Sequence, residues 1–512
     1  MRTARMIQGQ TLAAARPRAL AMVLAAAAGM PGCAVGPDHA APAVETPGAW
    51  ASPLEAGAVS APGDLSRWWT VLGDPVLDAL VVRALAGNHD LREAVARLAE
   101  ARAQRGVVAS QGGPQVDATG TYQRNRASES TGTTGQSFNA PGAERDLYQV
   151  GFDATWEIDV FGRVRRGVEA ADADIAAAAE NVRGVRVSLL AEVGRNYVEL
   201  RAFQRRVEIA RGNVAVQADT LKLVRARRDA GLSNDLDAAR AEANLETTRA
   251  AIPTLEAGVR SAAYRLSVLL GREPGVVLAE LTGAAPIPAV APEVPLGLPS
   301  ELLQRRPDVR GAEREVAAAS ARIGEATADL YPRFSLTGDF GFSSREIGNL
   351  TDSENRFWSF GPAVRWPILE WGRIRQNIKV QDARHEQSLI RFERAVLTAF
   401  EEVENALTNY ARERDRRASL AAAVAADQRA VDLSTDLYTK GLTDFLTVLD
   451  SQRELFQLQD QLVQSERSVA ANLIALYKAL GGGWEEGEGR EGDEPPQAAS
   501  RAVPGVAPSP KG

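Results

Sequence analysis

Side chains that usually perform catalysis or bind metals are few and scattered in this sequence. The three histidines are His39, His89 and His385, and none belongs to an HExxH motif, which would place two imidazoles on one helix face. Cys33 is the only cysteine, so neither an intrachain disulfide nor a cysteine-based metal site can form. The sequence therefore predicts no metal centre.

Phosphate-binding and acid-base motifs are missing as well. No Walker A motif occurs, and the string GEGREG from Gly487 follows no predicted strand, so it does not indicate a dinucleotide-binding loop. The adjacent carboxylates Glu401 and Glu402 point to different faces of a predicted helix. The net charge of −7 is made of interspersed charges, whereas nucleic-acid binding needs a clustered basic face. We expect no enzyme, no cofactor and no nucleic-acid partner.

Residues 1–32 predict a signal peptide, because arginines precede an apolar run at 20–28 that is too short to span a bilayer. The string MPGC, which ends at Cys33, resembles a bacterial lipobox, whose cysteine is acylated and becomes the mature N-terminus. Each buried CH₂ of an acyl chain contributes about 0.8 kcal/mol, so lipid on Cys33 would hold this end at a membrane.

The rest of the chain is internally duplicated. The first copy reads WEIDVFGRVR from Trp156, and the second reads WPILEWGRIR from Trp366, 210 residues later. The same spacing relates Gly231 to Gly441, Leu236 to Leu446, and Gly271 to Gly481. Upstream, a spacing of 218 residues relates Asp90 to Asp308, Gly106 to Gly324, and Gly120 to Gly338. Each copy predicts a helix, two strands, and a long helical hairpin.

This duplication divides the chain into six parts. They are the signal peptide (1–32), a lipidated extended segment (33–67), the first repeat (68–283), a Pro/Ala-rich connector (284–299), the second repeat (300–483) and a disordered tail (484–512).

Four segments, at about 115–124, 148–159, 333–343 and 357–366, alternate between apolar and polar residues. A soluble sandwich with one buried face is the alternative, but the many aromatics on one face favour membrane strands. Sheet edges are not tolerated in lipid, so other chains must complete the wall. Two chains would give 8 strands and three would give 12 with a lumen, which predicts a homotrimer if the barrel conducts. Pro362 predicts a bulge or irregular pairing in the fourth strand.

The helices are predicted to be unusually long. No proline occurs between Pro141 and Pro253 or between Pro367 and Pro495. The stretch 163–228 would span roughly 100 Å as one helix. Apolar residues recur at alternating threes and fours, as in a coiled coil. Pro253 is expected to bend or break the helix that contains it.

Together these features resemble the outer-membrane factor family of TolC/OprM-type efflux channels, and more closely its NodT-like lipoprotein branch. The resemblance covers Cys33 to about Trp484. It is carried by CAVGPDH after the lipobox, WWTVLGDPVLDALVVRALAGNHDL from Trp68, the paired FGRVR and WGRIR, and GLPSELLQRRPDVRGAE from Gly297.

The resemblance implies an α+β membrane protein in the Gram-negative outer membrane. Four transmembrane strands per chain would complete a 12-stranded trimeric barrel, and the long coiled-coil helices would form a periplasmic α-barrel. The implied role is passive conduction of exported small molecules in a tripartite pump. Its other parts would be a periplasmic membrane-fusion adaptor and an inner-membrane RND-type transporter.

The resemblance also assigns site residues. Two helix-helix turns correspond to the tips that meet the adaptor; these are Gly231, Leu232 and Ser233, and Gly441, Leu442 and Thr443. In FLTVLDSQRELF, Asp450 corresponds to the gate aspartate and Arg453 to its tether, while Thr447 replaces a second aspartate found in some members. A periplasmic adaptor lipoprotein is the main rival, but it predicts one helical hairpin rather than two.

Overall fold

The computed structural model describes residues 34–52, 58–59, 64–126, 144–281, 283–288, 294–295 and 297–484. Two compact units are present, and each takes segments from both repeats. Unit 1 comprises Met1–Ala40, Arg102–Asp174 and Val316–Ser388, and unit 2 comprises Ala41–Ala101, Ile175–Glu315 and Leu389–Gly512. The predicted signal peptide, Cys33 and the tail beyond Trp484 lie outside the described residues.

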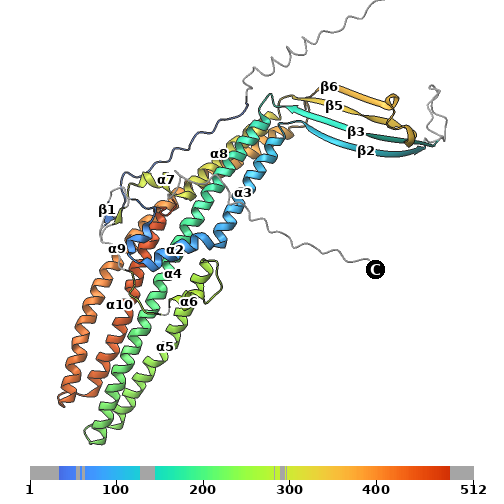
Figure 1. Ribbon diagram of the computed structural model, residues 1–512. Coiled ribbons are helices and arrows are strands. Elements are labelled where there is room, and N and C mark those ends of the chain that lie inside the picture. Colours follow the sequence, from blue (N-terminus) through green and yellow to red (C-terminus); the bar gives the residue numbers. More distant parts are fainter. Residues whose placement is uncertain are drawn as a thin grey trace, which may run out of the picture. The chain divides into compact units, whose positions relative to one another are not determined.

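Unit 1 contains a four-stranded antiparallel sheet with the order β2-β3-β5-β6 (Figure 1). The strands are β2 (Gln115–Arg126), β3 (Glu144–Ile158), β5 (Arg333–Ser344) and β6 (Arg356–Arg365). The two repeats meet at the centre of the sheet, where β3 of the first pairs with β5 of the second. In the described part of the chain, β2 and β6 have one partner each and form the sheet edges.

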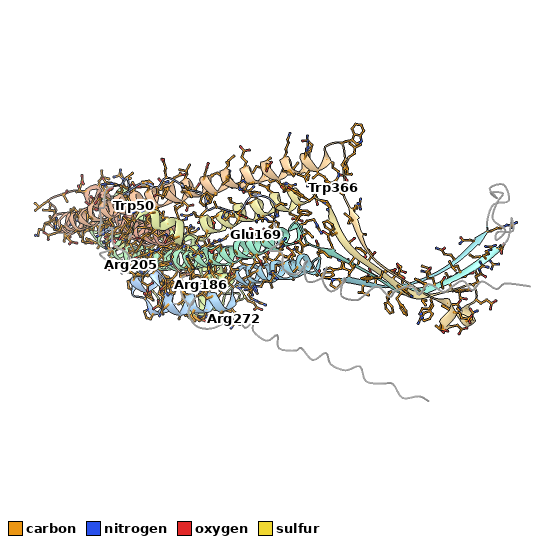
Figure 2. All side chains as sticks on the ribbon, turned by 90° about the horizontal axis from the view of Figure 1, so that it is seen from above. Trp50, Glu169, Arg186, Arg205, Arg272 and Trp366 are labelled. Carbon is orange, nitrogen blue, oxygen red and sulfur yellow. The ribbon has the colours of Figure 1, made fainter. Side chains whose placement is uncertain are left out.

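The two faces of this sheet differ in chemistry. Alternating residues of a strand point to opposite sides, and the register places most apolar residues of neighbouring strands on one face and most polar residues on the other. One face carries Val116, Tyr122, Val150, Phe152, Trp156, Leu336, Phe340, Trp358, Phe360 and Val364. The other carries Asp117, Thr119, Thr121, Asp153, Thr155, Thr337, Asp339 and Ser359. Side chains project from both faces (Figure 2). The apolar face is open, with Trp358 71% and Phe360 62% exposed.

The irregular pairing predicted at Pro362 is not found. Pro362 lies opposite Leu336, and the neighbouring pairs follow without a skipped residue. Proline lacks a backbone N–H, but it is tolerated on an edge strand when its nitrogen faces away from the partner strand. Because β6 is an edge of this sheet, its ladder with β5 needs no bulge.

Four long helices form two hairpins, α4 (Arg163–Asp229) with α5 (Asp235–Leu269), and α9 (Arg373–Thr439) with α10 (Phe445–Ala479) (Figure 1). The first helix of each hairpin has 67 residues and the second has 35. The shorter helices are η1 (Trp68–Leu72), α2 (Pro75–Gly87), α3 (His89–Ser110), α6 (Val276–Glu280), η3 (Pro299–Glu301), α7 (Leu302–Arg305), α8 (Pro307–Ala328), η4 (Ile347–Asn349) and η5 (Ser353–Asn355). Two short strands, β1 (Ala58–Val59) and β4 (Val294–Pro295), pair in parallel.

Pro253 does not break its helix, contrary to one of the two expected outcomes. It lies inside α5, which continues to Leu269. A proline removes one backbone hydrogen bond, but tertiary packing of an apolar face supplies most helix stability in proteins. The neighbours Ile252 and Leu255 pack in a cluster with Val207 and Ala210 of α4, which holds α5 in place on both sides of the proline.

The largest core of unit 2 forms around Trp68, which is 2% exposed. Its ring stacks on Tyr477 of α10, with 5.5 Å between centroids. Three glycines lie against this indole: a Cβ on Gly194, Gly482 or Gly483 would come within 3.2–3.3 Å of an indole atom. The absence of side chains at these positions therefore makes room for the tryptophan.

The duplication seen in the sequence extends to individual contacts. The indole of Trp156 donates to the Gly112 carbonyl at 2.8 Å, and that of Trp366, 210 residues later, donates to the Leu330 carbonyl at 3.1 Å. Likewise α3 and α8 have 22 residues each, and β2 and β5 have 12 each. The two repeats therefore fold into equivalent sets of elements.

None of the helices within the described ranges combines the length and apolar composition needed to cross a bilayer. The same residues contain no group of three or more His, Cys, Asp or Glu side chains that could hold a metal ion.

Candidate functional site

The two predicted helix tips share one backbone geometry. At the end of α4, Gly231 has a φ of 75°, and its N–H donates to the carbonyl three residues back at 2.8 Å. The Leu232 N–H donates to the carbonyl five residues back at 2.8 Å. Gly441, with a φ of 73°, and Leu442 repeat this pattern at 3.0 and 2.9 Å. Both tips are Schellman endings, which favour glycine because its φ is positive.

Side-chain caps begin the second helix of each hairpin. The Asn234 Oδ1 accepts from the Asp237 N–H at 2.8 Å, and the Asp444 Oδ1 accepts from the Thr447 N–H at 3.1 Å. The Thr447 hydroxyl donates to the same Asp444 oxygen at 2.9 Å, and these hydrogen bonds lower the pKa of Asp444. Ser233 donates to the Asp237 carboxylate at 2.9 Å, and Thr443 bonds the Thr447 hydroxyl at 3.2 Å. The structure therefore places Thr447, predicted as a gate position, in the tip cap.

The two tips lie side by side in unit 2 and expose leucine. The Arg227 Nη1 donates to the Thr439 carbonyl at 2.9 Å, which joins the end of α4 to the end of α9. Its guanidinium lies 4.8 Å from the centroid of the Tyr438 ring. Leu232 is 66% and Leu442 is 70% exposed, so the paired tips present two apolar side chains.

The remaining gate residues, Asp450 and Arg453, lie in the second and third turns of α10, near the tip. Asp450 is exposed and forms neither a hydrogen bond nor an ion pair with any described residue. The Arg453 Nε donates to the Asn244 Oδ1 at 3.2 Å, which ties α10 to α5. The neighbouring Gln452 Nε2 donates to the Thr220 Oγ1 of α4 at 2.8 Å. The structure thus brings Arg453 to Asn244 and not to Asp450.

Three further partners in this region, Asn244, Gln452 and Thr220, are not among the residues predicted from the sequence. All three are buried, at 5, 5 and 9% exposure. Buried polar groups must find hydrogen-bond partners, so amides within an otherwise apolar helix face are the pattern that could have revealed them. Their pairing needed the packing of α10 against α4 and α5.

The string QRRPDV in the second repeat forms a latch at the start of α8. Arg306 is 7% exposed, and its Nη1 donates to the Ala479 carbonyl at the end of α10 at 3.0 Å. It also pairs with Asp308 at 2.6 Å and Glu402 at 2.7 Å. Burial alone would raise the pKa of Asp308, but the Arg306 hydrogen bond and charge exceed that effect and hold the pKa below its usual value.

The first repeat has the same latch with a neutral donor. The Asn88 Nδ2 donates to the Leu269 carbonyl at the end of α5 at 2.9 Å. Asn88 precedes Arg306 by 218 residues, and Leu269 precedes Ala479 by 210. The latch therefore fixes the end of each hairpin to the start of the helix that precedes the strands of the same repeat, α3 or α8.

We expect Arg306→Ala to lower the free energy of unfolding by about 2–3 kcal/mol, because it removes hydrogen bonds from a buried charged donor. Thermal unfolding of the detergent-extracted protein measures this. The exposed pair Arg97–Glu93 supplies the control, since Arg97→Ala should change stability by at most about 0.5 kcal/mol. Because the Asp308 pKa is lowered, its share of stability is lost as pH falls below about 4. Below that pH, the difference in free energy of unfolding between Arg306→Ala and the wild type should become smaller. An equal loss of stability in Arg306→Ala and Arg97→Ala would contradict the latch.

The residues that follow Cys33 are part of unit 1 and pack against its other segments. The Val35 N–H donates to the Phe161 carbonyl at 3.2 Å. Arg166, whose side chain is 5% exposed, donates to the Val35 carbonyl at 3.1 Å and pairs with Asp38 at 2.7 Å. Gly36 has a φ of 94° and lies against Gly324, where a Cβ would come within 2.3 Å of the Gly324 Cα. The N-terminal segment is therefore anchored beside the end of β3.

Comparisons with known proteins agree with this arrangement. The chain is 31% identical over 464 residues to nodulation protein T of Rhizobium leguminosarum bv. trifolii, covering 88% of this chain and 95% of that protein. It is 32% identical over 460 residues to outer membrane protein OprJ of Pseudomonas aeruginosa, covering 89% and 94%. The solved structure of the outer-membrane channel OprN is similar with a TM-score of 0.80 and 36% identity, covering 88% of this chain and 100% of that one.

Two long helical hairpins, an amphipathic sheet and these similarities define the class as outer-membrane efflux channels. A sequence profile described as outer membrane efflux protein matches residues 80–272 and 298–482, one stretch in each repeat. The chain belongs to the outer membrane efflux protein family. The predicted family, function as an outer-membrane efflux component and outer-membrane location are thereby confirmed.

Proposed function

We propose that three copies of this chain form a passive exit duct whose 12-stranded barrel crosses the outer membrane. The observation that carries this proposal is the amphipathic sheet, which has four strands and two edges in the described part of each chain. Unsatisfied backbone groups at an edge are too costly in hydrocarbon, so an isolated sheet is not stable there. Four strands are too few for a barrel, whereas 12 enclose a lumen.

The two faces of the sheet support a barrel with lipid outside and water inside. Trp358, Phe360 and Val364 are more than half exposed on the apolar face, which suits contact with acyl chains. The opposite face carries Thr119, Asp153 and other polar residues that suit a water-filled lumen. The duct itself needs no catalytic group, so transport energy would come from partner proteins.

The helical hairpins would form the periplasmic part of the duct. Exposed Leu232 and Leu442 at the paired tips suit contact with apolar residues of a periplasmic membrane-fusion adaptor. The adaptor would connect the duct to an inner-membrane RND-type transporter. Among the similar proteins, TtgI of Pseudomonas putida is described as a toluene efflux pump outer membrane protein, with 30% identity over 468 residues.

Asp450 and Arg453 are proposed to control the narrow end of the duct. In a trimer, three Asp450 carboxylates around one axis would attract cations and line a constriction. Asp450 is exposed within one chain, which leaves it available to face the axis. Arg453 is held by Asn244, so it would tie α10 to α5 and limit outward movement of the gate helix.

We expect the double variant Asp450→Ala, Arg453→Ala to raise single-channel conductance in planar bilayers several-fold, because it removes both the acidic ring and the α10–α5 tether. Asn244→Ala removes the tether alone and should raise conductance less while leaving cation preference unchanged. Unchanged conductance in the double variant would rule out this gate.

Lipid on Cys33 is proposed to anchor the N-terminus. Support comes from the adjacent segment, because the contacts of Val35 and Arg166 hold residues 34–38 near the end of β3. A membrane strand ends near the headgroups, where acyl chains on Cys33 would reach the inner leaflet.

Purified full-length protein tests these proposals together. Native mass measurement in detergent should give a homotrimer, and denaturing mass measurement should show acyl groups on the fragment that begins at Cys33. The trimer should conduct ions across a planar bilayer. A monomer that conducts nothing would refute the trimeric duct.

A further inference from the structure

We infer the strand register that joins neighbouring copies: β6 of one chain pairs antiparallel with β2 of the next, with Ala363 opposite Thr121. This inference rests on the trimeric duct proposed above and adds its contact surface. Within one chain, β2 and β6 are the two edges of the sheet, and they come from different repeats. The chain already contains one junction between repeats, β3 with β5, which supplies the geometry.

The register follows from the two repeat spacings. A shift of 210 residues carries β3 onto the β6 region, and a shift of 218 carries β2 onto β5. At the in-chain junction Asp153 lies opposite Asp339. The equivalent of Asp153 is Ala363, and the equivalent of Asp339 is Thr121. If the junction between chains repeats the junction within the chain, Ala363 and Thr121 face each other.

Side-chain chemistry agrees with this register. It places Val364 opposite Gly120 on the apolar face, and Gly361 opposite Gln123 on the polar face. A slip by one residue would turn apolar side chains of β6 toward the polar face of β2. Aromatic Trp358 and Phe360 would lie opposite Arg126 and Arg124, where a guanidinium can lie over a ring, and Arg124 also pairs with Glu144 of β3 at 2.6 Å. The register also places Pro362 opposite Tyr122, and because proline has no N–H, the ladder between the chains lacks one donor at that pair.

The elbows that follow β3 and β6 give an independent reason to place a neighbour there. After β3, Phe161 stacks on Tyr331 at 4.7 Å and lies 6.5 Å from Phe334, and Gly162 is buried. After β6, the equivalent Trp371 is 94% exposed, and Gly372 is exposed. Trp371 also has a φ of 49°, the only positive φ of a non-glycine residue in the described ranges. A strained and exposed tryptophan indicates a covering surface outside the chain.

The same spacings identify what covers this elbow. The equivalents of Tyr331 and Phe334 in the first repeat are Gly113 and Val116, which would come from the neighbouring chain. The side-chain sizes at this contact compensate each other. The larger Trp371 stands where the first repeat has Phe161, and the small Gly113 stands where the second repeat has Tyr331. Val116 is 62% exposed in the single chain and is free to receive the indole.

Cysteine cross-linking in the full-length protein tests the register. Three double variants share Ala363→Cys and combine it with Thr121→Cys, Thr119→Cys or Gln123→Cys. All four positions are exposed on the polar face, so the substitutions disturb no core and an aqueous oxidant can reach them. Alternate positions along a strand are separated by roughly 7 Å, which a disulfide does not bridge. A fourth double variant combines Val364→Cys with Gly120→Cys. Opposite residues in an antiparallel ladder alternate between hydrogen-bonded and non-hydrogen-bonded pairs, so the two predicted pairs sample both types.

Copper phenanthroline is added to isolated membranes, and heated samples are run on non-reducing gels. Single-cysteine variants measure the background, including any thiol at Cys33. We expect a covalent trimer for Ala363→Cys with Thr121→Cys, or for Val364→Cys with Gly120→Cys, at least five times above the two shifted pairs. Greater or equal linking of a shifted pair overturns the register. No linking in a trimer of correct native mass also overturns it but leaves the duct standing, whereas a monomeric mass removes the duct as well.

Discussion

Replacing Leu232 and Leu442 together with aspartate is expected to reduce efflux to the level of cells without the channel. Both side chains are about two-thirds exposed at the paired tips, where they would be buried against the adaptor. Each apolar anchor at such a contact is worth roughly 1–2 kcal/mol, and a buried unpaired carboxylate adds a further cost. The adaptor should therefore bind about 100-fold more weakly or worse. Accumulation of a fluorescent pump substrate in whole cells measures the loss.

The matched control replaces the same two leucines with methionine, which is apolar and similar in volume. This variant should retain efflux. Both variants should form outer-membrane trimers at equal levels, because the two leucines are exposed and are not part of the core around Trp68. Wild-type efflux in the double aspartate variant, at equal trimer levels, would contradict adaptor contact at these tips.

Trp68→Ala should lower the free energy of unfolding by about 3–5 kcal/mol, more than Arg306→Ala. The indole is buried, stacks on Tyr477, and fills the space left by three glycines, so its removal leaves a cavity that the backbone cannot easily close. Thermal unfolding of the purified protein should shift down by several degrees or more. Replacement with phenylalanine should recover part of the loss.

Ile347→Ala is the control for this substitution, because Ile347 is 70% exposed and its truncation removes an apolar group from the surface. Its melting temperature should stay close to that of the wild type. A melting temperature for Trp68→Ala that matches the control would show that the stacking on Tyr477 contributes little to stability.

The candidate site was only partly readable from the sequence. The resemblance placed Gly231 and Gly441 at helix turns, and their positive φ values explain why glycine stands there. It assigned Arg453 as the tether of Asp450, and the structure adds the partner that the sequence did not indicate, Asn244 of another helix. Pairing across helices depends on how they rotate against one another, and helical periodicity alone does not fix that rotation.

Local sequence determined the elements of this protein. Alternation and the repeat spacings placed segments at 115–124 and 333–343, where β2 and β5 lie, because side chains of a strand must alternate between two unlike faces. The absence of proline allowed helices of 67 residues, because no break in the hydrogen-bond ladder was imposed. Membership in the outer membrane efflux protein family was also readable at this level.

Tertiary structure decided what distant residues do together. Arg306 reaches the Ala479 carbonyl across 173 residues of sequence, and Pro253 remains inside α5 although a break was one of its two expected effects. Both outcomes depend on packing between helices, whose contacts outweigh the preference of any single residue. The junction of β3 with β5 likewise exists only in the folded chain, since it unites the two repeats at the centre of one sheet.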